Sequence, residues 1–314
     1  MKFLTYSYDG IKSLGCLINE SDVLNISHLS YTVNENLPDN LSDYLINFDL
    51  NNILLKKIIN SNSINTISLN EVKIESLIQP KSFRDFYAFR QHVKAGRKSR
   101  GLRMIPEYDE FPVFYFSNHN SVIGPGKIEL FDKQIDKLDF ELEIGLVISK
   151  NGRNIKAKDA YKYVAGFTIL NDWSSRTIQM KEMKLNLGPA KGKDFATSIG
   201  PYLVTLDELQ DKMIGNIEEL RYDLSMEAFL NDKLISSDNF KNITWSFSDM
   251  IERASYGVEL VPGDLIGSGT CATGCLLELN QTNNKNSWLK DGDTISLKID
   301  KLGVLENKVS CIDL

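Results

Sequence analysis

Short apolar runs separated by turn residues dominate the chain from about residue 80 onward. The runs are rich in Val, Ile, Leu and Phe and are bounded by Gly, Pro and Asp, a pattern typical of β-strands. We predict strands at 111–117, 126–131, 140–149, 163–170, 202–206, 224–236, 264–269, 274–280, 293–303 and 304–312. Helical spacing is expected at 84–98, 157–163, 173–182 and 243–255. So many strands with few helices between them predict a mixed α+β fold that is mainly antiparallel, because parallel neighbours need long crossovers.

The first 78 residues read as a smaller α+β unit. Residues 3–18 predict a β-hairpin that turns at Asp9 and Gly10. Residues 41–59 have helical apolar spacing, with cap candidates between Asp39 and Ser42. We therefore predict a small N-terminal domain at 1–78 and a larger catalytic domain at 79–314.

Composition narrows the class of protein. The chain is 42% hydrophobic and 25% charged, as in an ordinary globular protein, and its formal charge of −6 argues against nucleic acid as a partner. No signal-peptide core or membrane-spanning run is evident, so we expect a cytoplasmic protein with no membrane partner. Cys271 and Cys275 are spaced CxxxC with no second pair or nearby histidine, so we interpret them as small buried residues and not as a zinc site.

The stretch DFELEIGLVI, at 139–148, places three acids on alternate positions of a predicted strand. Asp139, Glu141 and Glu143 would therefore project from one face and repel one another. On a strand the Cα atoms of Glu141 and Glu143 lie about 6.5–7 Å apart, so their long side chains can converge on one hard divalent cation, namely Mg²⁺, Ca²⁺ or Mn²⁺. The alternative is a solvated strand face, so a cation site needs further acids elsewhere in the chain.

Polar residues also follow an apolar strand in ILNDWSSRTIQM, at 169–180. Asp172, Arg176 and Gln179 stand at i, i+4 and i+7, on one face of the predicted helix or its first turn. They could form an anion-binding wall beside a metal. The alternative is an Asp N-cap with a surface arginine partner.

The segment 82–106 combines His92 with a basic run, which is unexpected in an acidic protein. A mobile basic lid that encloses an anionic substrate is one interpretation, and a solvated helix face is the other. Asp85 precedes His92 by two helical turns if the segment is helical, which would place both on one face. An acid and a histidine near a metal suit the activation of water.

Two glycine-rich segments follow. In LGPAKGKDFATSIGP, at 187–201, Lys193 sits on a loop whose glycines allow close backbone approach, and a lysine there can bind an oxyanion. In VPGDLIGSGTCATGCLLEL, at 261–279, we expect Glu278 to lie late in an apolar strand, half-buried and in need of a partner. His92 is the best candidate for that partner.

Taken together, these segments resemble the fumarylacetoacetate hydrolase family. The matching motifs are RDFYAFRQH at 84–92, DFELE at 139–143, NDWSSRTIQ at 171–179, LGPAKGKDFATSIGP at 187–201 and GDLIGSGT at 263–270. They occur in family order and cover about residues 80 to 314. The resemblance implies a distorted β-roll-like catalytic domain, generally dimeric, with a small N-terminal domain.

The resemblance also implies roles for the residues already named. It implies a divalent cation, Mg²⁺ or alternatively Ca²⁺ or Mn²⁺, held by Asp85, Glu141, Glu143 and Asp172. It implies that His92 activates a water and that Glu278 orients His92. Oxyanion stabilisation is expected from Arg176, Gln179 and Lys193, and substrate contacts from Tyr87, Arg100 and Thr270. Asp139 receives no role beyond a possible supporting hydrogen bond.

Family members act on 2,4-dioxo acids and related 2-oxo acids, so the expected partner is a small anionic diketo or 2-oxo acid. Our first hypothesis is a hydrolase of a carbon–carbon bond in a diketo acid, of fumarylacetoacetate or acylpyruvate type. A second is a lyase or isomerase on the same scaffold, either a 2-hydroxyhepta-2,4-dienedioate isomerase/decarboxylase or a 2-keto-3-deoxy sugar acid dehydratase. A third is a binding protein without catalysis.

Overall fold

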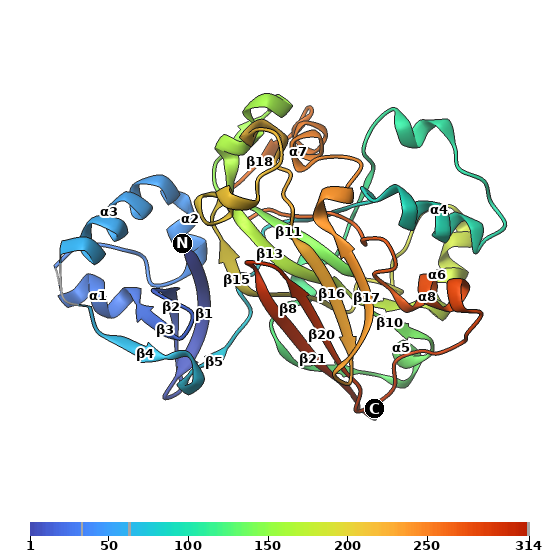
Figure 1. The fold of residues 1–314 in the computed structure, drawn as a ribbon, viewed down its shortest axis with the longest axis horizontal. Helices are drawn as coiled ribbons and strands as arrows, with labels where there is room; N and C mark the ends of the chain where they lie inside the picture. The colour runs from blue at the N-terminus through green and yellow to red at the C-terminus, as the bar shows by residue number, and fades with distance from the viewer. Residues whose placement is uncertain (33, 62–63, 313–314) are drawn as a thin grey trace.

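Two β-sheets form the framework of the protein, and most helices lie around their ends (Figure 1). The computed structural model describes residues 1–32, 34–61 and 64–312. The large sheet runs in the order β4 (Thr66–Ser68), β3 (Asp22–Asn25), β2 (Ile11–Leu17), β1 (Lys2–Tyr8), β15 (Thr197–Val204), β13 (Val164–Asp172), β11 (Leu142–Ile148), β19 (Leu265–Gly267), β6 (Phe83–Phe86) and β7 (Phe114–Phe116). On this sheet β5 (Lys73–Ile74) pairs with β1, and β8 (Val122–Ile123) pairs with β15.

The second sheet runs in the order β17 (Lys233–Asn239), β16 (Ser225–Leu230), β20 (Thr294–Ile299), β21 (Gly303–Cys311) and β9 (Gly126–Leu130). Two short ribbons join β10 (Leu138–Asp139) to β14 (Ser174–Ser175) and β12 (Gly152–Arg153) to β18 (Glu259–Leu260). The α-helices are α1 (Ile26–Thr32), α2 (Leu41–Ile46), α3 (Phe48–Ser61), α4 (Arg90–Lys98), α5 (Asp132–Ile135), α6 (Arg176–Glu182), α7 (Phe247–Ser255) and α8 (Leu276–Asn283).

Antiparallel pairing dominates both sheets, which confirms the predicted fold class. The parallel neighbours in the described part of the chain are β6 beside β19, β8 beside β15 and β9 beside β21. Apolar residues of β11 and β13 meet those of β16 and β20 in one buried cluster, so the main core lies between the sheets. Phe167 anchors this core, with its ring 5.1 Å from Phe247 and 5.5 Å from Tyr222. Such tilted aromatic contacts add to the stabilisation from burial.

The N-terminal segment forms the predicted hairpin, β1 and β2, and turns where expected. Asp9 and Gly10 both have positive φ, at 49° and 78°, as a tight two-residue hairpin turn requires. The predicted helix at 41–59 divides into α2 and α3, and Asn40 caps α2 by accepting a hydrogen bond from the Asp43 N–H at 3.0 Å. β1 pairs with β15, and Phe3 shares a buried cluster with Leu203. The N-terminal unit, on the left in Figure 1, therefore shares sheet and core with the rest, and the boundary at 78/79 stays a prediction.

Several predicted elements near the site were wrong or displaced. Residues 276–283 form helix α8, not the predicted strand at 274–280. The predicted strand at 140–149 begins at residue 142, and residues 138–139 belong to a separate ribbon. Helix α4 begins at residue 90, after strand β6, and α6 begins at residue 176. The segment 157–163 is a 3-10 helix, and the predicted helix at 243–255 begins at residue 247. Short apolar runs fit strands and buried helices equally well, which explains the error at α8.

The length and apolar character of the described helices decide whether any of them could span a membrane. None of those within residues 1–32, 34–61 and 64–312 has both the length and the apolar character needed to cross a bilayer.

Candidate metal centre and active site

Three buried carboxyl groups converge at one point of the large sheet. Asp172 ends β13, Glu143 lies on β11 and Asp85 lies on β6, and each offers an oxygen within 4.8 Å of the others. Strand β19 lies between β11 and β6, and its Gly267 stands beside Asp85 in register. A Cβ atom at Gly267 would lie 2.4 Å from Asp85 Oδ1 and 3.1 Å from Glu143 Oε2. The glycine therefore leaves the space in which these carboxyl groups meet.

Two of the three acids, Asp85 and Glu143, form no ion pair with a cation of the described structure, whereas Asp172 pairs with Lys193. Burial raises the pKa of Asp85 well above its usual value, and the charge of Asp172 adds to the effect. Burial and the charge of Asp85 do the same to the pKa of Glu143. The Oδ1 atoms of Asp85 and Asp172 are buried and have no hydrogen-bond partner among the described residues. Orphaned carboxylate oxygens at one point are the ligands that a hard divalent cation takes, so this group fits Mg²⁺, Mn²⁺ or Ca²⁺.

Glu141 lies beside the three acids, but two cations hold its carboxylate. Lys193 donates hydrogen bonds to Glu141 Oε2 and, at 2.6 Å, to Asp172 Oδ2. Arg176 Nη2 donates to Glu141 Oε1 at 2.7 Å. Burial by itself would raise the pKa of Glu141, but Lys193 and Arg176 outweigh it and lower that pKa below its usual value. The role of Glu141 as a fourth cation ligand stays a prediction.

Asp139, left without a clear role by the sequence, is fully buried and binds three donors. It accepts hydrogen bonds from Arg176 Nε at 2.8 Å and from the N–H groups of Leu276 at 2.7 Å and Leu277 at 3.0 Å. Those two N–H groups open helix α8 and have no partner within the helix. The supporting hydrogen bond that we expected is thus confirmed. Asp139 therefore links Arg176, which contacts Glu141, to helix α8, which carries Glu278.

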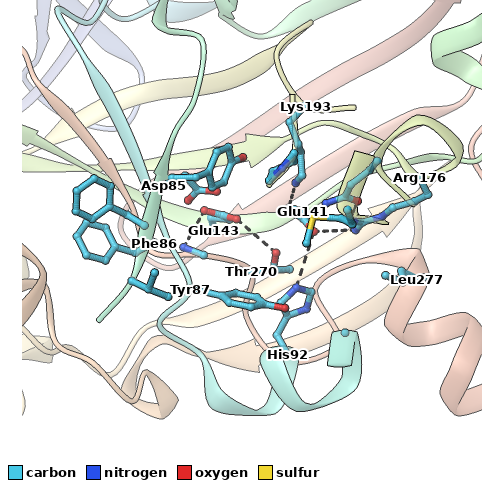
Figure 2. A pocket seen from close by; sticks show the side chains of 18 of the residues that line it. Asp85, Phe86, Tyr87, His92, Glu141, Glu143, Arg176, Lys193, Thr270 and Leu277 are labelled. Carbon is cyan, nitrogen blue, oxygen red and sulfur yellow. Dashed lines mark hydrogen bonds and ion pairs between the residues drawn. The ribbon is translucent and has the colours of Figure 1, made fainter. Parts of the chain in front are cut away.

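His92 and Glu278 meet as the sequence suggested, although Glu278 lies on α8 and not on a strand. His92 Nδ1 and Glu278 Oε2 are 3.2 Å apart, and both side chains are buried. The other ring nitrogen, Nε2, faces the cavity and lies 3.9 Å from Glu141 Oε1 (Figure 2). Gln91 donates to the second oxygen of Glu278 at 3.4 Å. A neutral imidazole whose Nδ1–H is held by a carboxylate presents Nε2 as a base.

A cavity of about 320 Å³ opens onto these groups. Figure 2 shows Asp85 and Glu143 on one side of it, Lys193 and Arg176 on the other, and Tyr87 beside His92. The Tyr87 ring meets the His92 ring edge-on at 5.7 Å between centroids. Seven of the residues with a predicted catalytic or substrate-binding role line the cavity, namely Tyr87, His92, Arg100, Arg176, Gln179, Lys193 and Thr270. The exception is Glu278, which contacts His92 from behind.

Local geometry explains how some of these side chains are placed. Arg176 Nη1 donates to Gln179 Oε1 at 2.9 Å, one turn further along α6. Gly192 approaches so closely that a Cβ there would lie 2.7 Å from the Gln179 backbone, which seats the loop that carries Lys193. Thr270 donates to Glu143 Oε1 at 3.4 Å. Thr270 therefore contacts the acid group as well as lining the cavity.

Two geometric expectations were wrong. Asp85 and His92 do not share a helix face, because Asp85 lies on β6 and the helix begins only at residue 90. Asp172 is the last residue of a strand and not part of the helix that holds Arg176. Asp85, His92 and Arg176 still line one cavity, and Asp172 meets Asp85 in the acid group beside it. Whether the basic run around 94–103 moves as a lid stays a prediction.

Tyr115 is a site residue that sequence reasoning missed. Its hydroxyl donates to Asp172 Oδ2 at 2.6 Å, and β7 pairs with β6 so that Tyr115 stands opposite Asp85. Burial raises the pKa of Tyr115 well above its usual value, and the charge of Asp172 adds to this effect, so the hydroxyl keeps its proton as a donor. The signal in the sequence is weak, because it is a single tyrosine between Phe114 and Phe116 in a short strand.

Comparison with known proteins now identifies the class. Residues 81–310 match the model of the family described as fumarylacetoacetate (FAA) hydrolase C-terminal. The match covers well over half of the chain, so the chain belongs to the fumarylacetoacetate hydrolase family and is an enzyme of that superfamily.

Among individual relatives, a fumarylacetoacetase of Arabidopsis thaliana is 30% identical over 268 residues, which cover 68% of this chain and 63% of the plant protein. A mitochondrial oxaloacetate tautomerase, Fahd2a of Rattus norvegicus, is 32% identical over 200 residues, or 63% of this chain and 58% of the rat protein. The matched part thus spans less than two thirds of either relative. The crystal structure of maleylpyruvate hydrolase from Sphingobium sp. SYK-6 in complex with manganese(II) and pyruvate superposes with a TM-score of 0.73 at 21% identity, covering 100% of both chains.

Proposed function

We propose that this chain is a divalent-metal-dependent hydrolase that cleaves a carbon–carbon bond in a small diketo acid of fumarylacetoacetate or acylpyruvate type. The observation that carries the proposal is the buried group of Asp85, Glu143 and Asp172, with its orphaned oxygens, next to the His92–Glu278 pair. A cation bound by these acids would polarise a substrate carbonyl and offset their charge. The maleylpyruvate hydrolase with a related fold holds manganese(II), and the Arabidopsis relative is named a fumarylacetoacetase.

His92 supplies the base in this mechanism. Its Nε2 faces the cavity and takes a proton from water, while Glu278 holds the Nδ1–H and stabilises the imidazolium that forms. The water oxygen adds to the acyl carbonyl carbon, and the bond from that carbon to the neighbouring methylene carbon breaks. The bonding electrons leave as an enolate, which takes a proton to give the second acid product.

Arg176 and Lys193 bring donors to the side of the cavity opposite Glu143 (Figure 2), and Gln179, which contacts Arg176, also lines the cavity. Such donors stabilise negative charge as it develops on a carbonyl oxygen. Lys193 also forms ion pairs with Glu141 and Asp172 and so offsets part of the negative charge at the cation site. Tyr87 and Arg100 line the remaining wall and would contact the substrate. We further propose that the protein acts as a cytoplasmic homodimer, which sedimentation of the purified chain would test.

The test is product analysis with purified protein and Mg²⁺ or Mn²⁺ on a panel of acylpyruvates and fumarylacetoacetate. We expect equal amounts of two acid products. Replacing His92 with alanine should lower kcat/KM by about 10²–10⁴-fold, as loss of a general base does. His28→Ala is the matched control, because His28 is exposed on α1 outside the cavity. A wild-type rate in His92→Ala would contradict the proposed role of this residue.

A second function, isomerisation or a lyase reaction on the same scaffold, is favoured by one finding. The rat relative, which is 32% identical over the matched segment, is named an oxaloacetate tautomerase. Enol and keto forms of a 2-oxo acid also interconvert through an enolate, so the same cavity could serve that reaction. Including oxaloacetate, a dienedioate and sugar 2-keto acids in the panel separates the two, since turnover without a cleaved acid pair would reject the hydrolase.

A further inference from the structure

Behind His92 lies a second group of potential metal ligands, and it differs in chemistry from the first. Cys275 Sγ lies 4.0 Å from His92 Nδ1, and Glu278 Oε2 lies 3.2 Å from the same nitrogen. The three ligand atoms lie within 4.8 Å of one another, and all three side chains are buried. The spacing of cysteines along the chain gave no sign of this, because His92 is 183 residues from Cys275.

The distances are close to those of a zinc site. Bonds of about 2.0–2.3 Å from Zn²⁺ to nitrogen, oxygen and sulfur place neighbouring tetrahedral ligands about 3.3–3.7 Å apart. The observed separations of 3.2 Å and 4.0 Å around His92 Nδ1 need only small shifts of side chains to reach these values. Three protein ligands and one water complete a tetrahedron.

We propose that Cys275, His92 and Glu278 form a site for a thiophilic divalent cation such as Zn²⁺, separate from the hard-cation site, and that its occupation inhibits the enzyme. Thiolate and imidazole select borderline and soft cations, whereas the all-oxygen group of Asp85, Glu143 and Asp172 suits Mg²⁺. Each cation thus has its own set of ligands, one in the acid group and the other behind His92.

We expect inhibition because the cation binds Nδ1 of His92. When Zn²⁺ binds at Nδ1, the thiol of Cys275 releases its proton to solvent, and the proton that the neutral imidazole carried on Nδ1 is transferred through solvent to Nε2. Nε2 then faces the cavity as an N–H donor and has no lone pair to accept a proton from water. This consequence, unlike the binding itself, rests on the proposed role of His92 as the base.

Other chemistry at Cys275 is disfavoured. Burial raises the pKa of the Cys275 thiol well above its usual value, so the thiol is protonated and a poor nucleophile in the absence of a cation. Cys271 is buried as well, but no metal-ligand group among the described residues includes it. Cys271 therefore provides a matched control thiol four positions away.

Titration with Co²⁺ tests the binding, with the protein first saturated with Mg²⁺. Cobalt bound by a thiolate gives a charge-transfer absorption in the near ultraviolet, whereas cobalt at an all-oxygen site does not. We expect wild type and Cys271→Ser to develop this band at one Co²⁺ per chain, and Zn²⁺ to abolish it. Cys275→Ser should lack the band, and Cys275→Ala serves as a second variant if the serine variant does not fold. No band in the wild type, or an undiminished band in folded Cys275 variants, would overturn the site.

Inhibition is measured separately, on the substrate that the panel identifies. We expect Zn²⁺ to inhibit the Mg²⁺-loaded wild type, and the concentration for half inhibition to rise at least about tenfold in Cys275→Ser, since loss of a ligand is worth at least 1.4 kcal/mol. A cobalt band without zinc inhibition would keep the site and overturn its inhibitory effect. Failure to find any activity leaves the cobalt titration as the deciding measurement of the site.

Discussion

Replacing Asp139 with asparagine tests whether one buried carboxylate holds Arg176 and helix α8 together. Asp139 is 0% exposed and accepts from the Arg176 guanidinium and from two N–H groups at the start of α8. Asparagine keeps the shape but removes the charge, and its amide nitrogen cannot accept a hydrogen bond from any of these donors. The change therefore leaves at least one buried donor without an acceptor.

The size of the effect follows from these contacts. Breaking a buried ion pair destabilises a protein by about 3–5 kcal/mol, but Arg176 keeps Glu141 as a partner at 2.7 Å, so the loss should be smaller. Losing a hydrogen bond to a charged group contributes about 1.5–3 kcal/mol, and an unsatisfied buried donor about 1–3 kcal/mol. We expect a total of about 3 kcal/mol, which corresponds to a fall in Tm of about 4–5 °C for a chain of this size.

Differential scanning calorimetry of the purified variant measures this directly. Asp136→Asn is the matched control, because Asp136 is an exposed acid three positions earlier. A Tm for Asp139→Asn within about 1.5 °C of the control, which corresponds to less than about 1 kcal/mol by the same scaling, would refute the reasoning. Activity should fall together with Tm even at temperatures where the variant is folded, because α8 carries Glu278.

Three further predictions concern the cation site. Tyr115→Phe removes the hydroxyl that donates to Asp172 at 2.6 Å and should weaken Mn²⁺ binding by about 10–100-fold. Calorimetric titration measures the affinity, and an unchanged affinity would contradict a supporting role for this hydroxyl. Gly267→Ala places a Cβ 2.4 Å from Asp85 Oδ1 and should abolish Mn²⁺ binding, so retained affinity would show that the acids can move apart. Removing bound cation with a chelator should abolish turnover and lower Tm, and excess Mg²⁺ or Mn²⁺ should restore both; full activity in chelator would contradict the metal dependence.

The sequence could predict the fold class because its strongest signals are local. Hairpin β1–β2 is visible from alternating residues around Asp9 and Gly10, and no distant contact is needed to see it. Helix α8 shows the limit of such signals. Its first N–H groups are satisfied by Asp139, 137 residues earlier, and no local residue reveals that partner. An apolar run of a few residues then fits a strand as well as a helix.

The sequence predicted which residues form the site better than it predicted how those residues are arranged. Glu141 and Glu143 were expected on one continuous strand, yet β11 begins only at residue 142. Glu141 therefore binds Lys193 and Arg176, while Glu143 meets Asp85. Tyr115 escaped notice, and Cys275 was interpreted only as a small buried residue. Strand register and helix packing bring their partners, Asp172 and His92, to them, and the spacing of residues along the chain does not encode these contacts.

The charges around the cavity support the proposal that a cation binds among Asp85, Glu143 and Asp172. The buried acids Asp85, Asp139, Glu141, Glu143 and Asp172 share two buried cations, Arg176 and Lys193. Both cations are engaged by Asp139, Glu141 and Asp172, and neither forms an ion pair with Asp85 or Glu143 within the described structure. Positive charge is therefore missing on the side of the cavity where Asp85 and Glu143 meet. A divalent cation would supply it there and leave Arg176 and Lys193 in place to receive charge from the substrate.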